Sequence, residues 1–357
     1  MKMKQIIKRN ILAGFLLFAG MLMFAQTPTL PNIVILATGG TIAGAGTSAT
    51  GSAYTSGQVK IEAMIDAVPN IRNLANLKGE QIANVGSQDM SVKVWLDLAN
   101  RINTLLAGND VDGIVITHGT DTQEETAYFL NLVVKSDKPV VLTGSMRPST
   151  ALSAEGPLNL YNAVAVAANP KSKGYGVVVV MNDEIHSAHG VKKMITTPVQ
   201  TFQSPEEGML GTVIFGDVEF FHKTYGRYTV NSEFSVDGVT SLPRVDIVYA
   251  CADVSPDLID IMVKAGAKGI VIAGVGDGNM NAGTLEAAKR ATKMGISVVR
   301  ASRVPIGAVL LKGEINDEEY GTVSSMEHNP QKARVLLMLA LMKERSREDL
   351  QRLFIEY

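Results

Sequence analysis

Two short apolar runs, each followed at once by a turn of glycine and threonine, constrain the fold of this chain most strongly. Residues 33–37 lead into Thr-Gly-Gly-Thr at 38–41, and residues 113–117 lead into His-Gly-Thr-Asp at 118–121. Continuous runs of Val and Ile are typical of parallel strands covered on both faces. Because the ligand crevice of an open parallel sheet lies outside the carboxyl ends of its strands, we expect the two turns to converge on one substrate.

Further apolar runs of strand length alternate with segments of helical periodicity along the chain. A helix is predicted from about residue 91, where apolar side chains recur every three or four positions, and residues 255–257 are typical of another helix start. The other strands are predicted at 140–142, 177–180, 245–249, 270–273 and 297–299, and the last helices at 330–343 and 346–355. This alternation indicates the α/β class.

The alternation fails between about residues 201 and 243, where Gly and Pro are scattered among polar and aromatic residues. We therefore predict two α/β domains: a larger N-terminal domain over 26–220 with a parallel, flavodoxin-like sheet, and a smaller C-terminal domain over 244–357. A linker over 221–243 joins them. A length of 357 residues and a hydrophobic content of 46% are sufficient for two cores.

The first 25 residues have the pattern of a secretory signal peptide. Four basic residues precede an apolar stretch over 11–24, which ends beside the small Ala25. An uncleaved anchor is the alternative, although the stretch is shorter than the roughly 20 residues that cross a bilayer. We expect a periplasmic or secreted protein, which has no membrane association after the signal is removed.

Charge and cysteine usage narrow the class of partner. The formal net charge is −2, and the chain becomes more acidic once the basic leader is removed, which disfavours nucleic acid as a partner. The only cysteine, Cys251, has no partner for an intramolecular disulfide. The two cores must therefore stabilise the fold without a covalent link.

The turns carry two threonines, Thr41 and Thr120, that are candidates for nucleophilic chemistry. A threonine hydroxyl needs a base or polarising group within hydrogen-bond reach and donors for the oxyanion. Glycines beside both threonines let backbone N–H groups approach a substrate closely. Lys193 is a candidate base, although spacing alone favours the alternative that Lys192 and Lys193 are solvated surface charges.

Asp121 follows Thr120 directly and has two possible roles. Its carboxylate can bind the ammonium group of a ligand, or it can cap a helix over residues 122–134, with Glu124 and Glu125 favourably placed in the first turn. Both roles can hold at once. The polar loop at 86–89 offers further hydrogen-bonding groups, although such tetrapeptides are also common in turns.

Other classes of site fit the sequence poorly. Neither glycine cluster matches a dinucleotide or phosphate-loop motif. His186 and His189 lie three apart beside acidic residues, but nothing else has the spacing of zinc ligands. Ser145 lacks the second glycine of a hydrolase nucleophile turn. We expect no metal and no cofactor.

At these residues the chain resembles the bacterial L-asparaginases, and most closely the exported, type II members. The resemblance extends from about Pro31 to the carboxyl end. Its signature segments are residues 37–44 and 113–122, with further agreement at 86–90, 146–149, 302–305 and 329–337. The two signatures together are far more specific than either glycine cluster alone.

The resemblance implies a two-step amide hydrolysis that forms L-aspartate and ammonia from L-asparagine. Thr41 resembles the family's nucleophile, and Tyr54, on a mobile loop at about 42–60, resembles the residue that helps to activate it. Thr120, Asp121 and Lys193 resemble a second polar cluster, in which the threonine and the lysine pass protons and Asp121 binds the α-ammonium group.

The resemblance also implies how the substrate is bound. Ser87 and Gln88 match residues that bind the α-carboxylate and α-ammonium groups. Asn279 and Glu314 match positions that complete the pocket from a neighbouring subunit, in a homotetramer built as a dimer of dimers. Two departures are present: no disulfide is possible at Ser136, and Asp277 stands where a close relative has an amide.

Three other functions are weighed against an asparaginase. A glutaminase-asparaginase would act on both amides, because one methylene is typically worth only about 1 to 3 kcal/mol of discrimination. An exported amino-acid binding protein would bind without turnover, but binding alone has no use for two threonines on such turns. An amidase acting on an amide carried by tRNA is disfavoured by the export signal and the negative charge.

Overall fold

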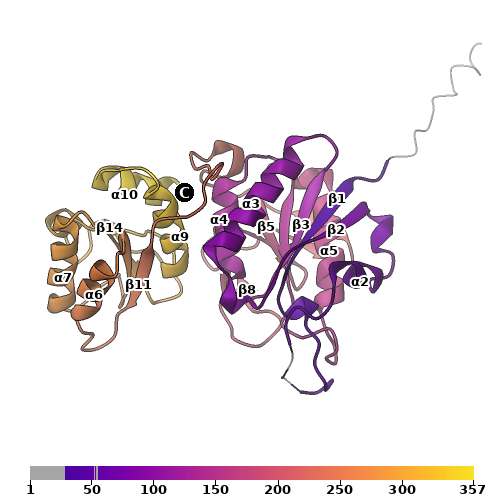
Figure 1. Cartoon of the computed structure of the whole chain (residues 1–357), viewed down its shortest axis with the longest axis horizontal. Helices are drawn as coiled ribbons and strands as arrows, with labels where there is room; N and C mark the ends of the chain where they lie inside the picture. Colours follow the sequence, from indigo (N-terminus) through magenta and orange to yellow (C-terminus); the bar gives the residue numbers. More distant parts are fainter. Residues whose placement is uncertain (1–28, 52, 54) are drawn as a thin grey trace, which may run out of the picture. The chain divides into compact units, whose positions relative to one another are not determined.

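The computed structural model describes residues 29–51, 53 and 55–357. The predicted signal peptide and the predicted site residue Tyr54 lie outside this part of the chain. The described strands form two large sheets, one in each of two α/β domains, and a small ribbon of two strands (Figure 1). The predicted fold class is confirmed.

The N-terminal domain contains an eight-stranded sheet in the order β10-β9-β6-β5-β4-β3-β1-β2. Its strands are β1 Asn32–Gly39, β2 Asn76–Val85, β3 Gly113–Thr117, β4 Val140–Thr143, β5 Val177–Met181, β6 Glu184–Ser187, β9 Gly211–Ile214 and β10 Asp217–Phe220. The first five are parallel in the flavodoxin-like order 2-1-3-4-5, and β6, β9 and β10 add an antiparallel edge. This edge was not predicted from the sequence.

Strands β1 and β3 are neighbours at the point where the strand order reverses. Their register pairs Ala37 with Thr117, so both strands end at the same level. The turn after β1 carries Thr41, and the turn after β3 carries Thr120. The sequence prediction that the two turns lie side by side is therefore confirmed by the topology.

Alternate residues of each central strand enter different cores, as expected for a sheet covered on both faces. Val34 and Leu36 of β1 belong to one cluster, whereas Ile33 and Ile35 belong to the other. The first cluster includes α3 Val92–Ala107 and α4 Gln123–Val133, and the second includes α2 Ile61–Asp66 and α5 Gly156–Ala168. Burial of this apolar surface is the main stabilising contribution to the domain.

The C-terminal domain has a four-stranded parallel sheet in the order β11-β12-β13-β14. Its elements are β11 Val245–Tyr249, α6 Asp257–Lys264, β12 Gly269–Gly274, α7 Ala282–Lys293, β13 Ser297–Ser302, α8 Asp317–Tyr320, β14 Val323–Ser324, α9 Pro330–Ala340 and α10 Arg347–Glu356. The ribbon is β7 Lys192–Lys193 paired with β8 Phe202–Gln203. Short 3-10 turns lie at Thr41–Ala43, Ile71–Asn73, Ser87–Asp89, Pro170–Ser172 and Thr229–Asn231.

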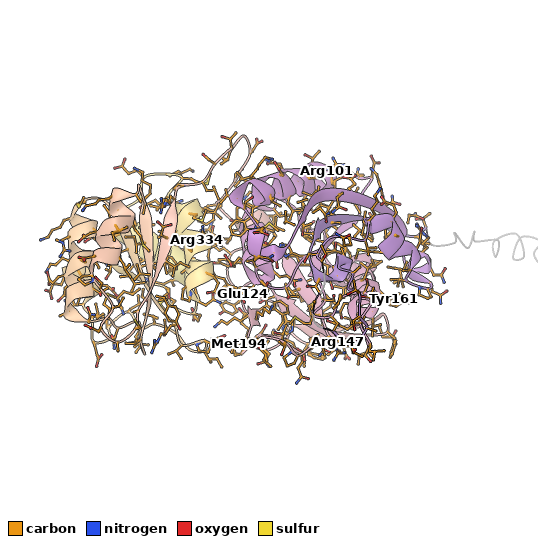
Figure 2. All side chains as sticks on the ribbon, turned by 60° about the horizontal axis from the view of Figure 1, so that its bottom comes forward. Arg101, Glu124, Arg147, Tyr161, Met194 and Arg334 are labelled. Atoms are coloured by element: carbon orange, nitrogen blue, oxygen red, sulfur yellow. The ribbon has the colours of Figure 1, made fainter. Side chains whose placement is uncertain are left out.

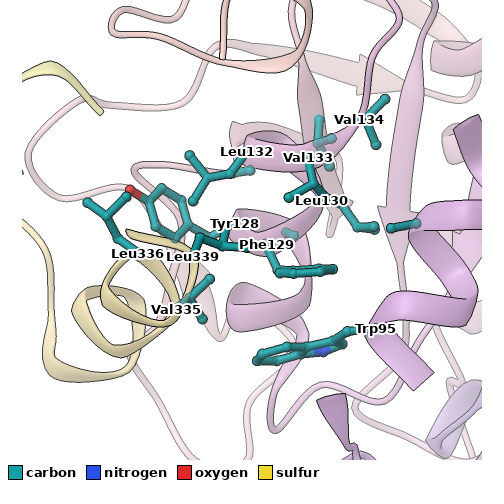
Figure 3. Close-up of a cluster of buried hydrophobic side chains, with 14 of the residues drawn as sticks. Trp95, Tyr128, Phe129, Leu130, Leu132, Val133, Val134, Val335, Leu336 and Leu339 are labelled. Carbon is teal, nitrogen blue, oxygen red and sulfur yellow. The ribbon is translucent and has the colours of Figure 1, made fainter. Parts of the chain in front are cut away.

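Helix α4 of the N-terminal domain packs against α9 of the C-terminal domain. Figure 3 shows Tyr128 of α4 beside Leu336 and Leu339 of α9, and all three side chains are fully or almost fully buried. One hydrophobic cluster thus continues from the larger sheet into the smaller domain. This contact fixes the start of α9 close to the start of α4.

No helix in the described part of the chain is both long enough and apolar enough to cross a membrane.

Candidate active site

A cleft of about 480 Å³ lies where the turns after β1 and β3 meet. Thr41, Thr120, Asp121 and Lys193 all line it. The two threonines are only 6% and 5% exposed, so their hydroxyl groups lie in a site largely shielded from solvent. Four of the sequence-predicted residues are thereby brought together.

The two signature turns touch through their backbones. Gly40 has a φ of 81°, and a Cβ atom at this position would lie 2.3 Å from the backbone nitrogen of Gly119. A Cβ atom on Gly119 would lie 2.6 Å from the hydroxyl oxygen of Ser87. Glycine is required at both positions because any side chain would separate the two turns.

Lys193 reaches the turn that carries Thr120 from the short strand β7. Its Nζ donates a hydrogen bond to Thr120 Oγ1 at 3.0 Å and forms an ion pair with Asp121 Oδ1 at 2.6 Å. The interpretation of Lys192 and Lys193 as solvated surface charges is wrong. Lys192 is 5% exposed and bonds to Glu206, and the side chain of Lys193 is 16% exposed.

The expected helix cap at Asp121 is also wrong. Helix α4 begins at Gln123 after Thr122, and no side-chain cap is formed there. The carboxylate of Asp121 pairs with Lys193 instead. Glu124 and Glu125 do lie in the first turn, as predicted.

Ser87 lies directly behind the turn after β3. Its hydroxyl oxygen accepts a hydrogen bond from the backbone N–H of Asp121 at 3.1 Å, and its carbonyl accepts one from Thr122 Oγ1 at 2.8 Å. Gln88 is exposed, and its amide folds back over Gly86. The structure thus places Ser87 against the turn, and neither Ser87 nor Gln88 is among the described residues that line the cleft.

His118 supports the same turn from inside the protein, and sequence reasoning assigned it no role. Its Nδ1 lies 2.6 Å from the carbonyl oxygen of Gly119, and its Nε2 lies 2.9 Å from Thr126 Oγ1, which also accepts from Trp95 Nε1. The carbonyl oxygen of Gly119 can only accept, so it requires a proton on Nδ1. Burial lowers the pKa of His118 to about 4, in agreement with a neutral ring.

Asn279 and Glu314 do not belong to the described residues that line the cleft of their own chain. They bond to each other in the C-terminal domain, through Asn279 Nδ2 and Glu314 Oε2. Asp277 accepts a hydrogen bond from the backbone N–H of Leu310 at 2.8 Å, so it holds the loop that leads to Glu314. An amide oxygen could accept this hydrogen bond equally well, so the contact does not explain why a carboxylate stands at this position.

Other lining residues were assigned no role from the sequence. They come from two loops, at 146–152 and 196–197, and from the segment 49–51 after Thr41. The resemblance did single out residues 146–149 and the loop at about 42–60 as segments, but it gave these lining side chains no function. Among the described residues, no group of three or more His, Cys, Asp or Glu side chains could hold a metal ion.

Comparison with known families agrees with this geometry. Residues 32–225 match the family model described as "Asparaginase, N-terminal", and residues 244–354 match "Glutaminase/Asparaginase C-terminal domain". The chain belongs to the asparaginase family. This family consists of amidohydrolases, so the asparaginase fold described above is that of an enzyme of this class.

Individual asparaginases are similar over nearly their whole length. L-asparaginase 2 of Escherichia coli is 51% identical over 92% of this chain and 94% of its own. The "Probable L-asparaginase periplasmic" of Haemophilus influenzae is also 51% identical, over 93% and 95%. The glutaminase-asparaginase of Pseudomonas fluorescens is 48% identical over 92% and 91%.

A solved structure shares the fold. The crystal structure of a probable cytoplasmic L-asparaginase from Campylobacter jejuni superposes with a TM-score of 0.89 at 48% identity. The match covers 92% of this chain and all of that one. Because this relative is named cytoplasmic and the Haemophilus relative periplasmic, the shared fold does not determine the compartment.

Proposed function

We propose that this protein is an exported L-asparaginase that hydrolyses the side-chain amide of L-asparagine through an ester on Thr41. The observation that carries the proposal is the meeting of Thr41 with the Lys193, Thr120 and Asp121 cluster in one cleft. Two hydroxyl groups, a basic nitrogen and a carboxylate are the groups that such a reaction uses. The family membership supports amide hydrolysis as the reaction class.

The first step forms the ester. The Thr41 oxygen attacks the amide carbon and loses its proton, the amide nitrogen gains a proton, and the C–N bond breaks to release ammonia. Backbone N–H groups of the glycine turn stabilise the oxyanion, because glycine lets them approach the carbonyl oxygen. Tyr54 is proposed to assist Thr41, as in the family.

The second step releases aspartate. Water attacks the ester carbon and gives a proton to a group of the site. The site returns a proton to the Thr41 oxygen as the bond between this oxygen and the ester carbon breaks. Lys193 is proposed to move protons through Thr120, to which it is hydrogen-bonded at 3.0 Å. Asp121, together with Ser87 and Gln88, is proposed to bind the α-ammonium and α-carboxylate groups of the substrate.

A second subunit is proposed to complete the pocket. Asn279 and Glu314 bond to each other next to an exposed loop that carries Val304, Ile306 and Leu310, which are 45%, 53% and 56% exposed. These apolar side chains are available to pack against a second copy, where their burial would stabilise the contact. We propose a dimer in which this surface packs against a second copy, and a tetramer of two such dimers.

Export is proposed from the sequence of residues 1–25 and from the periplasmic name of the Haemophilus relative. The boundaries at 26–220, 221–243 and 244–357 remain our proposal for the mature domains and their linker.

The decisive experiment measures ammonia release from L-asparagine by the purified protein. We expect turnover in the parent, a loss of about 10³-fold or more in Thr41→Ala and a comparable loss in Thr120→Val. Thr104→Ala, on the exposed face of α3, is the control and should keep the parental rate. Tight binding of asparagine with no ammonia release would instead identify a binding protein.

A glutaminase-asparaginase is the second candidate, favoured by the 48% identity to the enzyme from Pseudomonas fluorescens. The ratio of kcat/KM for L-asparagine to that for L-glutamine distinguishes the two. A ratio near one supports this candidate, and we expect a ratio of at least about ten.

A further inference from the structure

Glu124 is a buried carboxylate that joins three segments of the chain. It lies on the first turn of α4, just after the turn with Thr120, and is 3% exposed. Its Oε2 accepts the backbone N–H of Lys193 at 2.6 Å. Its Oε1 accepts hydrogen bonds from Asn329 Nδ2 at 3.0 Å and from Gln331 Nε2.

The two amide donors come from the C-terminal domain. Asn329 caps α9, since its Oδ1 accepts the backbone N–H of Lys332, and Gln331 lies in the first turn of that helix. Figure 2 labels Glu124 where α4 faces this domain. One carboxylate therefore connects the start of α4, the start of α9 and the strand β7.

Lys332 supports the same strand from the same helix. Its side chain is 1% exposed, and its Nζ donates hydrogen bonds to the carbonyl oxygens of His189 and Val191, which lie just before β7. Burial lowers the pKa of Lys332 to about 8, and the negative charge of Glu124 opposes this effect. The carboxylate of Glu124 thus also helps to keep the second support of β7 in its charged form.

Strand pairing alone cannot hold Lys193 in place. Strand β7 has two residues and pairs only with the two residues of β8 in the described structure. A ribbon of this size is marginal by itself. The position of the Lys193 backbone must therefore depend on the side-chain contacts that reach β7 from α4 and α9.

We propose that Glu124, held by Asn329 and Gln331, is a positioning residue that fixes the backbone of Lys193 so that its Nζ meets Thr120 and Asp121. The inference rests on the proposed function, because it concerns the proton-transfer group of that reaction. Glu124 is not among the described residues that line the cleft, so we assign it no direct contact with substrate. Its effect is on turnover, since displacement of a catalytic group by about 1 Å costs on the order of a hundredfold in rate.

The test compares Glu124→Gln with Glu125→Gln. Glutamine has almost the same shape as glutamate, but it has one acceptor oxygen in place of two. Its NH₂ group would face one or more of the N–H donors that now bond to Glu124. We expect Glu124→Gln to lower kcat for asparagine by about 10- to 100-fold and to change KM by less than about threefold. Glu125→Gln makes the same change at the neighbouring position of the same helix, where the carboxyl is not the acceptor of the Lys193 N–H. We expect it to keep kcat within about twofold of the parent.

A second variant covers the case in which Glu124→Gln does not fold. Gln331→Met removes one of the donors to Glu124 at a partly exposed position and retains the volume of the side chain. We expect kcat to fall about three- to tenfold in a variant that still unfolds cooperatively in urea, at a somewhat lower midpoint because the buried carboxylate loses one donor. Unchanged kcat in Gln331→Met would then overturn the inference.

Two further results would also overturn it. One is full kcat in a folded Glu124→Gln variant. The other is an equal loss of kcat in Glu124→Gln and Glu125→Gln, which would indicate a general loosening of the domain contact.

The parent and Thr41→Ala are assayed in parallel. If the parent shows no turnover, or if Thr41→Ala retains the parental turnover, the proposed function fails. If Lys193→Met is inactive while Glu124→Gln is fully active, only the role of Glu124 is refuted.

Discussion

At the scale of single residues, the site depends on two positions where only glycine fits, because a Cβ atom would collide with neighbouring atoms. Gly40 and Gly119 let two turns from distant parts of the sequence touch, and Ser87 fills the space behind them. The sequence predicted this arrangement, because glycine next to threonine directly after an apolar strand is typical of a turn that approaches a ligand closely. Spacing alone did not predict the place of Lys193, because its 73-residue separation from Thr120 carries no pattern, whereas the family resemblance did place it beside Thr120 and Asp121.

The backbone contact at Gly40 leads to a prediction about Gly40→Ala. A Cβ atom would lie 2.3 Å from the nitrogen of Gly119, so the two turns must move apart. We expect kcat/KM for asparagine to fall by at least about a hundredfold, because Thr41 is displaced from Thr120. Steady-state kinetics on the folded variant provide the measurement.

Gly266→Ala is the matched control for this change. Gly266 also has a positive φ, of 93°, but no atom lies within 4 Å of the position of its Cβ. Both variants place alanine at a positive φ, which costs about 1 to 3 kcal/mol of backbone strain, and only Gly40→Ala adds a collision. Equal activity in the two variants would show that the contact between the turns is unimportant.

At the scale of secondary structure, α4 connects the site to the rest of the protein. Its buried face packs on the sheet and on α9, and its first turn carries Glu124 and Glu125. Helices with clear periodicity were predicted near their observed positions, because one apolar face is visible in the sequence. The antiparallel strands β6, β9 and β10 were missed, because each has four residues and their pairing is set by contacts outside them.

The environment of α4 makes the stability of the protein depend on pH through Glu125. Burial raises the pKa of this carboxyl from its ordinary value of 4.5 to about 7, with Arg334 opposing the shift and Glu124 adding to it. The folded state then holds the proton more tightly than the unfolded state does, so stability falls as pH rises from about 4.5 to 7. Above pH 7 the full cost of the buried charge is present.

Glu125→Gln should remove this cost. We expect the variant to be more stable than the parent at pH 8 by about 1 to 3 kcal/mol and to match the parent near pH 4. Urea unfolding at the two pH values measures the difference. A variant that is destabilised equally at both pH values would show that ionisation of the Glu125 carboxyl does not lower the free energy of unfolding.

At the scale of the whole molecule, the functional groups lie in two places. Thr41, Thr120, Asp121 and Lys193 share a cleft of the N-terminal domain, whereas the pair of Asn279 and Glu314 lies in the C-terminal domain. The resemblance to exported asparaginases implies that a neighbouring copy supplies this pair, and this stays a prediction. The link from Glu124 to Asn329 was not predictable, because it spans 205 residues and each partner is an ordinary helix-terminus residue by sequence.

If the pocket is shared between copies, two inactive variants should restore each other. Thr41→Ala and Glu314→Ala are each expected to lose most of their activity. After the two are unfolded together and refolded at equal concentrations, half of the dimers contain both kinds of chain, and each of these has one intact site. We therefore expect about a quarter of the parental activity from random pairing.

Refolding each variant separately and then mixing the products is the control, since formed dimers exchange slowly. No recovery in the co-refolded sample, with both variants folded and assembled, would place Glu314 outside the pocket of the neighbouring copy.

The positions along the sequence of the α9 side chains that support β7 have a consequence for shortened forms of the chain. All eight strands of the larger sheet and both threonine turns lie before residue 221, whereas α9 begins at Pro330. A fragment that stops before α9 would keep the strands that form the cleft but would lack the side chains that reach Glu124 and the segment before β7. We therefore expect Lys193 to be held less firmly in such a fragment than in the whole chain.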